Sequence, residues 1–283
     1  MRALWLVLLA IVMAGAEAAA QATPPVREIS KIAGEIYRFR NNNHYSVFAV
    51  TPDGIIATDP INADAATWLK AELKSRFDKP VKYLIYSHDH ADHSSGGHVF
   101  ADTAIVVAHA KAKAAILGEK RPTAVPQVTF TERMTIVLGG TELELTHVGR
   151  NHSDNSIVMR FPKERLLFAV DFIPVNAVAF RDFPDAYVPD WIESLRRVEA
   201  MDFDILAPGH GPLGRKEHVN QFREYLEDLR QAVLSLAREG KSLDEMKQTI
   251  KLPKYEGWAG YQQMFQLNIE GMYRLVQANR RGN

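Results

Sequence analysis

The six residues 88–93, HDHADH, bring together three histidines and two aspartates directly after the apolar run 81–87. Such groups cost free energy to bury unless something pairs with them. Imidazole nitrogens and carboxylate oxygens are zinc ligands, and a tight loop can aim neighbouring side chains in different directions. The spacing H-x-H-x-D-H therefore makes metal-ligand candidates of His88, His90, Asp92 and His93.

Three further candidates each follow an apolar run that reads as a strand. His152 comes after TELELT, Asp171 ends LLFAVD, and His210 follows DILAPG. Taken singly, Asp171 is equally compatible with a helix cap and His210 with a turn. Loops at one edge of a sheet converge in space, so seven such groups together predict one metal centre at that edge.

The elements that must position these residues change in character along the chain. Short runs rich in Val, Ile and Phe alternate with helical patterns up to about residue 214, which indicates an α/β fold with mixed strand pairing. Asp190 and Glu193 predict a capping box at the start of a helix. Beyond residue 216 the patterns are helical only. The expected strands are 45–50, 54–59, 81–87, 104–108, 134–148 as a hairpin, 156–170 as a second hairpin, and 204–207; the expected helices are 63–77, 109–118, 190–201, 217–239, one from 242, and 261–277.

Four motifs in this order, HDHADH, GRNHSDN, FAVD and APGHG, resemble those of the metallo-β-lactamase superfamily of hydrolases. The resemblance runs from about Glu35 to Leu213. It implies a four-layer αβ/βα sandwich that binds two zinc ions at one edge. The predicted organisation is a metallo-β-lactamase-like domain over 21–214 and a C-terminal helical extension over 215–283.

Carried over motif by motif, the resemblance assigns a role to each candidate. It implies that Asp171 bridges the two metals and that Asp59, in ATDP, hydrogen-bonds a ligand histidine, although a strand-end cap is a nearly equal alternative for Asp59. The first zinc would be held by His88, His90 and His152, and the second by Asp92, His93 and His210.

Two zinc ions can share a hydroxide and lower its pKa toward neutrality, so that no serine or cysteine nucleophile is needed. Asp92 is the candidate catalytic residue that orients this hydroxide. The expected reaction is hydrolysis of an ester, thioester or lactone, because Asp171 stands where β-lactamases of the superfamily usually have cysteine or serine. The segment NHSDN resembles the β-lactamase version of its motif, which keeps a class B-like metallo-β-lactamase as an alternative.

Other functions remain as alternatives. Iron-dependent sulfur dioxygenases share the fold and the H-x-H-x-D-H pattern with one metal and fewer ligands, and histidine and carboxylate suit iron as well as zinc. A non-catalytic zinc-binding protein is a further alternative. Structural zinc sites are closed and four-coordinate, however, whereas this set supplies three ligands per metal and a bridge. The formal net charge is zero, from 34 basic and 34 acidic side chains, which argues against a nuclease or any nucleic-acid partner.

The substrate is expected to be a small molecule. The aromatic segment 172–191 forms either a pocket wall, with Phe180, Phe183, Tyr187 and Trp191, or packing between the two halves, and His44 is a further pocket candidate. The C-terminal helices either cover the pocket or pair with another subunit in a homo-oligomer.

The first twenty residues predict an exported protein. Arg2 precedes an apolar run to Ala16, and Ala18 and Ala20 form an A-x-A arrangement, which is typical of a signal peptide cleaved after Ala20. The run is too short for a stable membrane anchor. The chain has no cysteine, which fits a periplasmic or secreted location.

Overall fold

The structure is a computed structural model that describes residues 24–279. The predicted signal peptide, residues 1–20, lies outside the described residues. Within 24–279, every helix is too short or too polar to cross a membrane.

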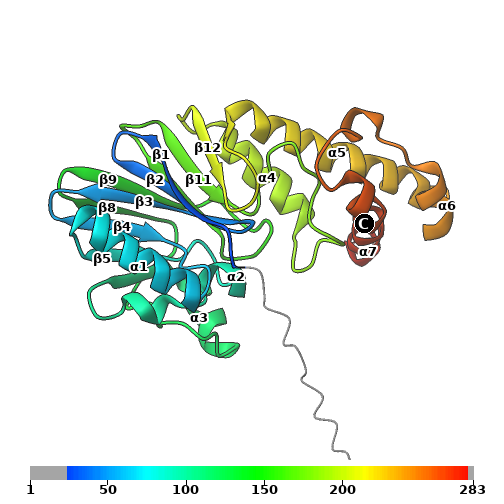
Figure 1. The fold of residues 1–283 in the computed structure, drawn as a ribbon. Helices are drawn as coiled ribbons and strands as arrows, with labels where there is room; N and C mark the ends of the chain where they lie inside the picture. Colours follow the sequence, from blue (N-terminus) through cyan, green and yellow to red (C-terminus); the bar gives the residue numbers. More distant parts are fainter. Residues whose placement is uncertain (1–23, 280–283) are drawn as a thin grey trace, which may run out of the picture.

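Two β-sheets lie face to face (Figure 1). In the first sheet the strands follow chain order, antiparallel from β1 to β4 and parallel from β4 to β7. Its strands are β1 (Arg27–Ala33), β2 (Ile36–Asn41), β3 (His44–Thr51), β4 (Gly54–Thr58), β5 (Val81–Ile85), β6 (Ile105–His109) and β7 (Val128–Phe130).

The second sheet has the order β13-β12-β11-β10-β9-β8, and only β11 and β12 pair in parallel. Its strands are β8 (Arg133–Leu138), β9 (Thr141–His147), β10 (Ile157–Phe161), β11 (Leu166–Val170), β12 (Ile205–Pro208) and β13 (Gly214–Arg215). The helices are α1 (Ala63–Phe77), α2 (Ala91–Ser94), η1 (Gly97–Phe100), α3 (Ala110–Gly118), α4 (Val188–Glu199), α5 (Lys216–Arg238), α6 (Leu243–Thr249), η2 (Pro253–Tyr255) and α7 (Tyr261–Asn279).

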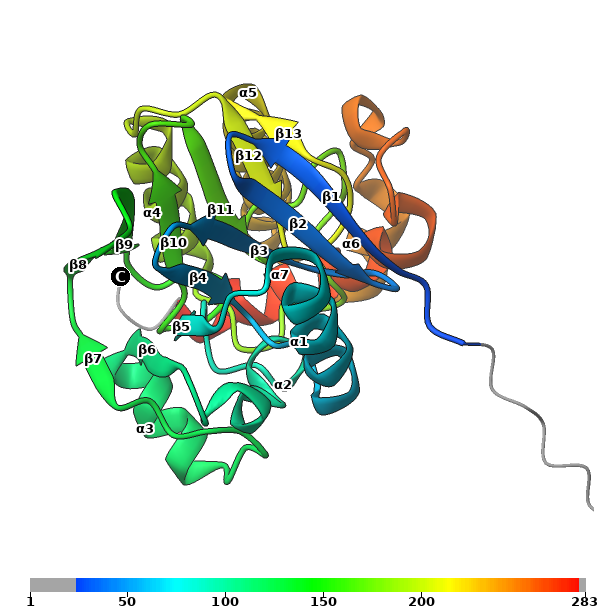
Figure 2. The same cartoon turned by 60° about the vertical axis from the view of Figure 1, so that its left-hand side comes forward.

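Alternation of side chains along buried strands builds three separate cores and hence four layers. In β11, Phe168 packs between the sheets, whereas Leu167 and Ala169 face the helices α4 and α5. In β4, Ile56 packs between the sheets and Ile55 faces α1. Helices α1 and α3 therefore cover one outer face and α4 and α5 the other (Figures 1 and 2). This confirms the predicted four-layer α/β sandwich.

The helices after residue 215 share the core of the second sheet and do not form a separate body. Phe222 of α5, Met246 of α6 and Ile269 of α7 belong to the same cluster as Leu167. Helix α7 also holds the segment after β11: a Cβ at Gly271 would fall on the backbone carbonyl of Asp182. The C-terminal helices are thus packed against the segment that the sequence singled out as a pocket wall.

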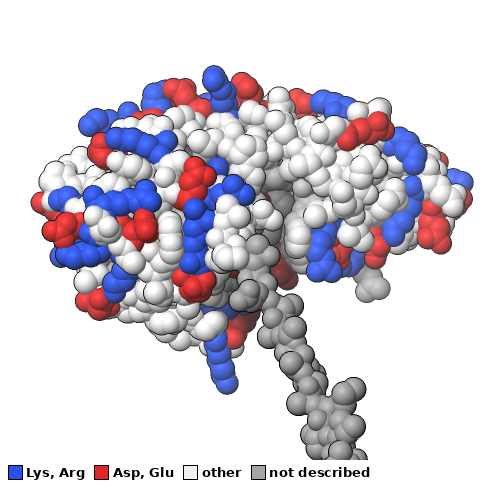
Figure 3. All heavy atoms as spheres, in the orientation of Figure 1, with Lys and Arg blue, Asp and Glu red and all other residues white. Residues whose placement is uncertain are grey.

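The surface carries charges of both signs close together. On the face drawn in Figure 3, lysine and arginine alternate with aspartate and glutamate over both sheets and the C-terminal helices. Fields of mixed sign cancel beyond about a Debye length of roughly 8 Å at physiological salt. That face therefore offers no extended field of one sign.

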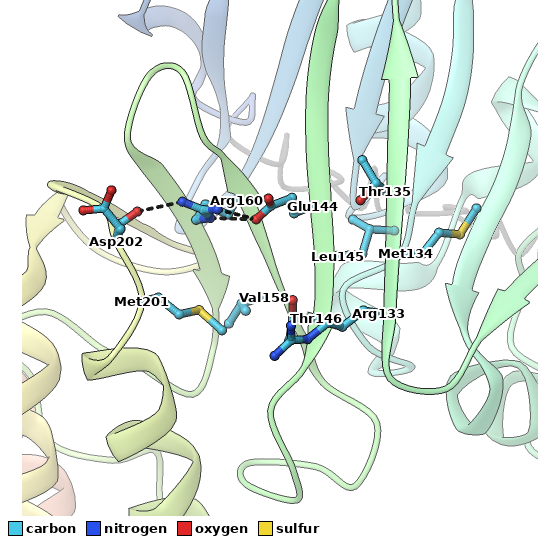
Figure 4. A pocket seen from close by; sticks show the side chains of 10 residues that line it. All are labelled: Arg133, Met134, Thr135, Glu144, Leu145, Thr146, Val158, Arg160, Met201 and Asp202. Atoms are coloured by element: carbon cyan, nitrogen blue, oxygen red, sulfur yellow. Dashed lines mark hydrogen bonds and ion pairs between the residues drawn. The ribbon is translucent and has the colours of Figure 1, made fainter.

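A cavity of about 390 Å³ lies on the outer side of the second sheet, between β8–β10 and the residues that follow α4 (Figure 4). The guanidinium of Arg160 in this cavity already has hydrogen-bond partners, because it donates to Glu144 at 2.7 Å and to the Asp202 carbonyl at 3.1 Å. None of the metal-ligand candidates lines it. It is separate from the site described next.

Candidate metal centre

The seven ligand candidates come from loops that meet at one edge of the two sheets. The loop between β5 and α2 supplies His88 and His90, α2 supplies Asp92 and His93, and the loops after β9, β11 and β12 supply His152, Asp171 and His210. Strand β5 ends at Ile85, two residues earlier than predicted, although the Tyr86 amide still donates to Val107 in β6. The strand ends thus aim all seven side chains at one place.

The first cluster contains His88, His90, His152 and Asp171, whose ligand atoms all lie within 4.8 Å of one another. His152 Nε2 lies 3.0 Å from His90 Nδ1. Asp171 Oδ2 lies 3.8 Å from the Nε2 atoms of both His88 and His152. Three imidazoles and one carboxylate oxygen therefore surround one point.

The second cluster contains Asp92, His93, His210 and again Asp171. His93 Nε2 lies 3.1 Å from Asp171 Oδ2, and the Nε2 atoms of His93 and His210 are 3.3 Å apart. Asp92 Oδ2 lies 3.6 Å from His210 Nε2. Asp171 thus belongs to both clusters, which is the geometry that a bridging carboxylate requires.

The donor set fits two metal ions. His88 Nε2 is buried with no hydrogen-bond partner, and buried polar atoms are rarely left in that state. Pairs of ring nitrogens also face each other within 3.3 Å across both clusters. A cation bound between these nitrogens would give the His88 nitrogen a partner and would remove the repulsion between facing nitrogens. Three protein ligands and a shared carboxylate would leave room for a reactant on each metal.

The environment sets the protonation of these histidines. Burial lowers the pKa of His152 to about 4 and, with the neighbouring histidines, holds the pKa of His88 well below its usual range. Burial acts to lower the pKa of His210, but hydrogen bonds to Asp171 and Asp92 outweigh it and raise the pKa to about 9. His88 and His152 are therefore ready to bind a metal at neutral pH, whereas a metal at His210 would have to displace a proton.

Hydrogen bonds behind the ligands fix their ring orientation. Asp59 accepts hydrogen bonds from the amide and hydroxyl of Ser87, and its Oδ2 lies 3.2 Å from His93 Nδ1. The Ser87 hydroxyl lies 2.9 Å from His88 Nδ1. One buried carboxylate thus orients a ligand candidate of each cluster, directly for His93 and through Ser87 for His88.

Arg38 of β2 is a positioning residue that sequence reasoning missed. Its buried guanidinium forms no ion pair within the described residues, and burial lowers its pKa to about 10. Instead it donates to the carbonyls of Pro208 at 3.0 Å and Gly211 at 2.7 Å, and stacks 3.6 Å from the centre of the Tyr45 ring. These carbonyls flank His210, so Arg38 ties the ligand loop to the first sheet.

We expect Arg38→Ala to weaken binding of the second metal about tenfold, as loss of an outer hydrogen-bond partner usually does. Competition with a chelator during zinc titration measures this affinity. Arg38→Lys, which keeps the positive charge and a nitrogen that donates hydrogen bonds, should lose less. If Arg38→Ala unfolds more easily but binds both metals with unchanged affinity, Arg38 serves stability only.

A cavity of about 880 Å³ opens directly onto both clusters. Of the pocket candidates, His44, Phe180, Phe183 and Trp191 line it. Tyr187 does not: it precedes α4, and its ring packs against the Arg150 guanidinium at 4.5 Å. Sequence reasoning also missed Met264 and Gly260, whose place in the wall depends on the packing of α7.

Comparison with known proteins agrees with this geometry. Residues 59–210 match the family model described as metallo-beta-lactamase superfamily. The chain is 30% identical over 197 residues to 2,4-dinitroanisole O-demethylase subunit alpha of Nocardioides sp. (strain JS1661), covering 68% of this chain and 60% of that relative. It is 26% identical over 206 residues to metallo-beta-lactamase type 2 of Elizabethkingia meningoseptica, covering 69% and 82%.

Solved structures support the fold. A metallo-beta-lactamase from Pontibacter korlensis superposes with a TM-score of 0.64 at 21% identity, covering 71% of this chain and 99% of that one. The family match begins at Asp59 and ends at His210, so it spans every ligand candidate. The chain belongs to the metallo-β-lactamase superfamily of hydrolases.

Proposed function

We propose that the chain is a zinc-dependent hydrolase that cleaves an ester, thioester or lactone. The observation that carries the proposal is the position of Asp171, whose carboxylate belongs to both ligand clusters. Two zinc ions held in this way would supply a hydroxide nucleophile and a Lewis acid for the scissile carbonyl.

The side chains around the clusters have separable tasks. Asp92 is half-exposed at the cavity, and its Oδ2 lies 3.3 Å from His44 Nε2. Burial acts to raise the pKa of Asp92, but hydrogen bonds from His210 and His44 outweigh it and hold the pKa well below its usual range. Asp92 is therefore ionised and able to orient the nucleophile, while His44 holds the carboxylate in place.

Ester-type substrates suit this site better than β-lactam amides. A carboxylate shared by two metal ions would add negative charge between them and would reduce the help that they could give to an amide nitrogen as leaving group. Esters and thioesters have better leaving groups and need less of that help. The relative from Nocardioides, named as an O-demethylase, is consistent with cleavage at oxygen.

A class B-like β-lactamase is the second candidate. The relative from Elizabethkingia is named as a metallo-beta-lactamase, and its match to this chain covers 82% of its length. A sulfur dioxygenase is less well supported, because its single iron would leave one of the two four-group clusters without a metal.

We expect about two zinc ions per chain and a higher kcat/KM on an ester, thioester or acyl-homoserine lactone than on nitrocefin or a carbapenem. Elemental analysis and a direct comparison of these five substrates measure both. A kcat/KM on the lactams above that on every ester would favour the β-lactamase. A single iron with oxygen consumption would replace the hydrolase by the dioxygenase.

A further inference from the structure

The cavity extends from the metal clusters into a space walled largely by apolar side chains. We propose that this space, the apolar arm, binds a neutral alkyl or aryl group of the substrate and selects against a carboxylate at that position; the inference rests on the proposed ester hydrolysis. The apolar arm is defined by Val178, Phe180, Phe183, Trp191, Gly260 and Met264.

The apolar arm begins at the metal centre itself. The indole of Trp191 lies against the ring of His152, with ring centres 5.9 Å apart, and Phe183 packs edge-on against Trp191 at 6.2 Å. Trp191 donates its indole hydrogen to the carbonyl of Phe172, which leaves no polar atom of the ring to face a ligand. A group attached to a carbonyl at the clusters would therefore meet aromatic surface first.

The far wall comes from the C-terminal helices, outside the residues that match the family. The amide of Ala259 donates to Asn176 at 2.8 Å, and the amide of Val178 donates to Ala259 at 3.1 Å. A Cβ at Gly260 would lie 3.5 Å from Val178 and 3.6 Å from the sulfur of Met264. The start of α7 and the segment after β11 thus form one continuous apolar surface.

Phe180 shows that this surface is available to a ligand. Its side chain lines the cavity, yet 57% of the residue remains exposed. Large aromatic side chains usually bury most of their area, and an exposed apolar patch beside a reactive site marks a binding surface. Covering this ring with an alkyl or aryl group would remove apolar area from water.

The charges around the cavity disfavour an anionic group in the apolar arm. Arg121 is the one lysine or arginine among the described lining residues, and its guanidinium is already paired with Glu119 and lies 3.5 Å from Asp89. Asp185 also lines the cavity. Arg181 is not a lining residue, although its guanidinium lies 6.0 Å from the centre of the Phe180 ring. A substrate carboxylate among the lining side chains would lose water without gaining an unpaired lining cation, which is costly.

Two esters of equal chain length test the proposal. The p-nitrophenyl ester of hexanoic acid ends in a methyl group, and the mono-p-nitrophenyl ester of adipic acid ends in a carboxylate. We expect the metal-loaded wild-type protein to prefer the hexanoate by at least about tenfold in kcat/KM, because the unpaired carboxylate is desolvated. Equal kcat/KM for the two esters would overturn the proposal.

Charge introduced into the apolar arm should change this ratio. Met264→Lys places a cation there, and Phe180→Lys does the same at an exposed position where folding is not at risk. Both are expected to shift the ratio toward the adipate ester by about tenfold. Leu267→Lys, on an exposed part of α7 that does not line the cavity, is the matched control and should leave the ratio unchanged. An equal shift in the control would contradict the proposal.

A binding measurement separates this inference from the proposed function. Hexanophenone is a neutral ketone that carries the same alkyl chain and cannot be hydrolysed. Its affinity for the metal-loaded protein, measured by calorimetry, should fall in Phe180→Lys and stay the same in Leu267→Lys. Binding with this pattern but no ester hydrolysis would overturn the proposed function alone. Ester hydrolysis with no effect of Phe180→Lys on binding or on the ratio would overturn the apolar arm alone.

Discussion

Replacing Asp171 with alanine is expected to lower kcat/KM on the best ester about 10³-fold. Among the described residues, this carboxylate is the one group common to both ligand clusters, so its loss would weaken metal binding at both. Metal ions supply several kcal/mol of transition-state stabilisation, and about 4 kcal/mol corresponds to about 10³-fold in rate. Steady-state kinetics and zinc analysis of the same sample measure the loss and the expected fall below two zinc ions per chain.

The fold should survive this substitution. Asp171 does not contribute to the hydrophobic cores, since none of the three apolar clusters includes it. Circular dichroism should therefore stay near that of the wild type. Asp244→Ala, at an exposed position in α6, is the matched control and should keep full activity. If Asp171→Ala keeps two zinc ions and activity within tenfold, the carboxylate does not bridge the metals.

The grouping of the seven ligand candidates could be predicted because it depends on local signals. Each candidate lies at or just beyond an apolar run, and the carboxyl ends of strands that run in the same direction lie at the same sheet edge. His152 and His90 are 62 residues apart in sequence, yet their ring nitrogens are 3.0 Å apart. The pattern required no knowledge of the loops between them.

Residues that act across long sequence separations could not be predicted in this way. Arg38 and the loop that carries His210 are about 170 residues apart, and a single arginine in a strand carries no local sign of its partner. Met264 likewise reads as an ordinary apolar position of an amphipathic helix. Its role depends on how α7 packs, which periodicity does not determine.

Local capping rules also gave one wrong boundary. Asp190 and Glu193 predict a capping box, but α4 begins at Val188 and Asp190 forms an ion pair with Arg150. Pro189 explains the earlier start, because proline is favoured in the first turn of a helix, where its missing amide hydrogen is not needed. The carboxylate was therefore free to pair with another part of the chain.

Helix α7 is expected to be essential for both stability and the shape of the cavity, and Asn268 is where a substitution tests this. The side chain is fully buried, accepts a hydrogen bond from the Tyr225 hydroxyl, and donates to the carbonyls of Ala179 and Arg181. These two carbonyls flank Phe180. One amide therefore joins α5 and α7 to the backbone that presents an aromatic ring to the apolar arm.

Asn268→Leu should lower the free energy of unfolding by about 3 kcal/mol, because it leaves buried donors and acceptors without partners at about 1–3 kcal/mol each. Urea denaturation measures this loss. Gln266→Leu, the same change of an amide to leucine at an exposed position of α7, is the control and should change stability by less than about 0.5 kcal/mol.

The Asn268→Leu variant should still bind two zinc ions, since α7 supplies none of the ligand candidates. Its KM for the hexanoate ester should rise while its KM for p-nitrophenyl acetate stays near the wild-type value, because we expect the short acetyl group to end before Phe180. A parallel rise for both esters would mean that α7 supports the whole site and not the apolar arm.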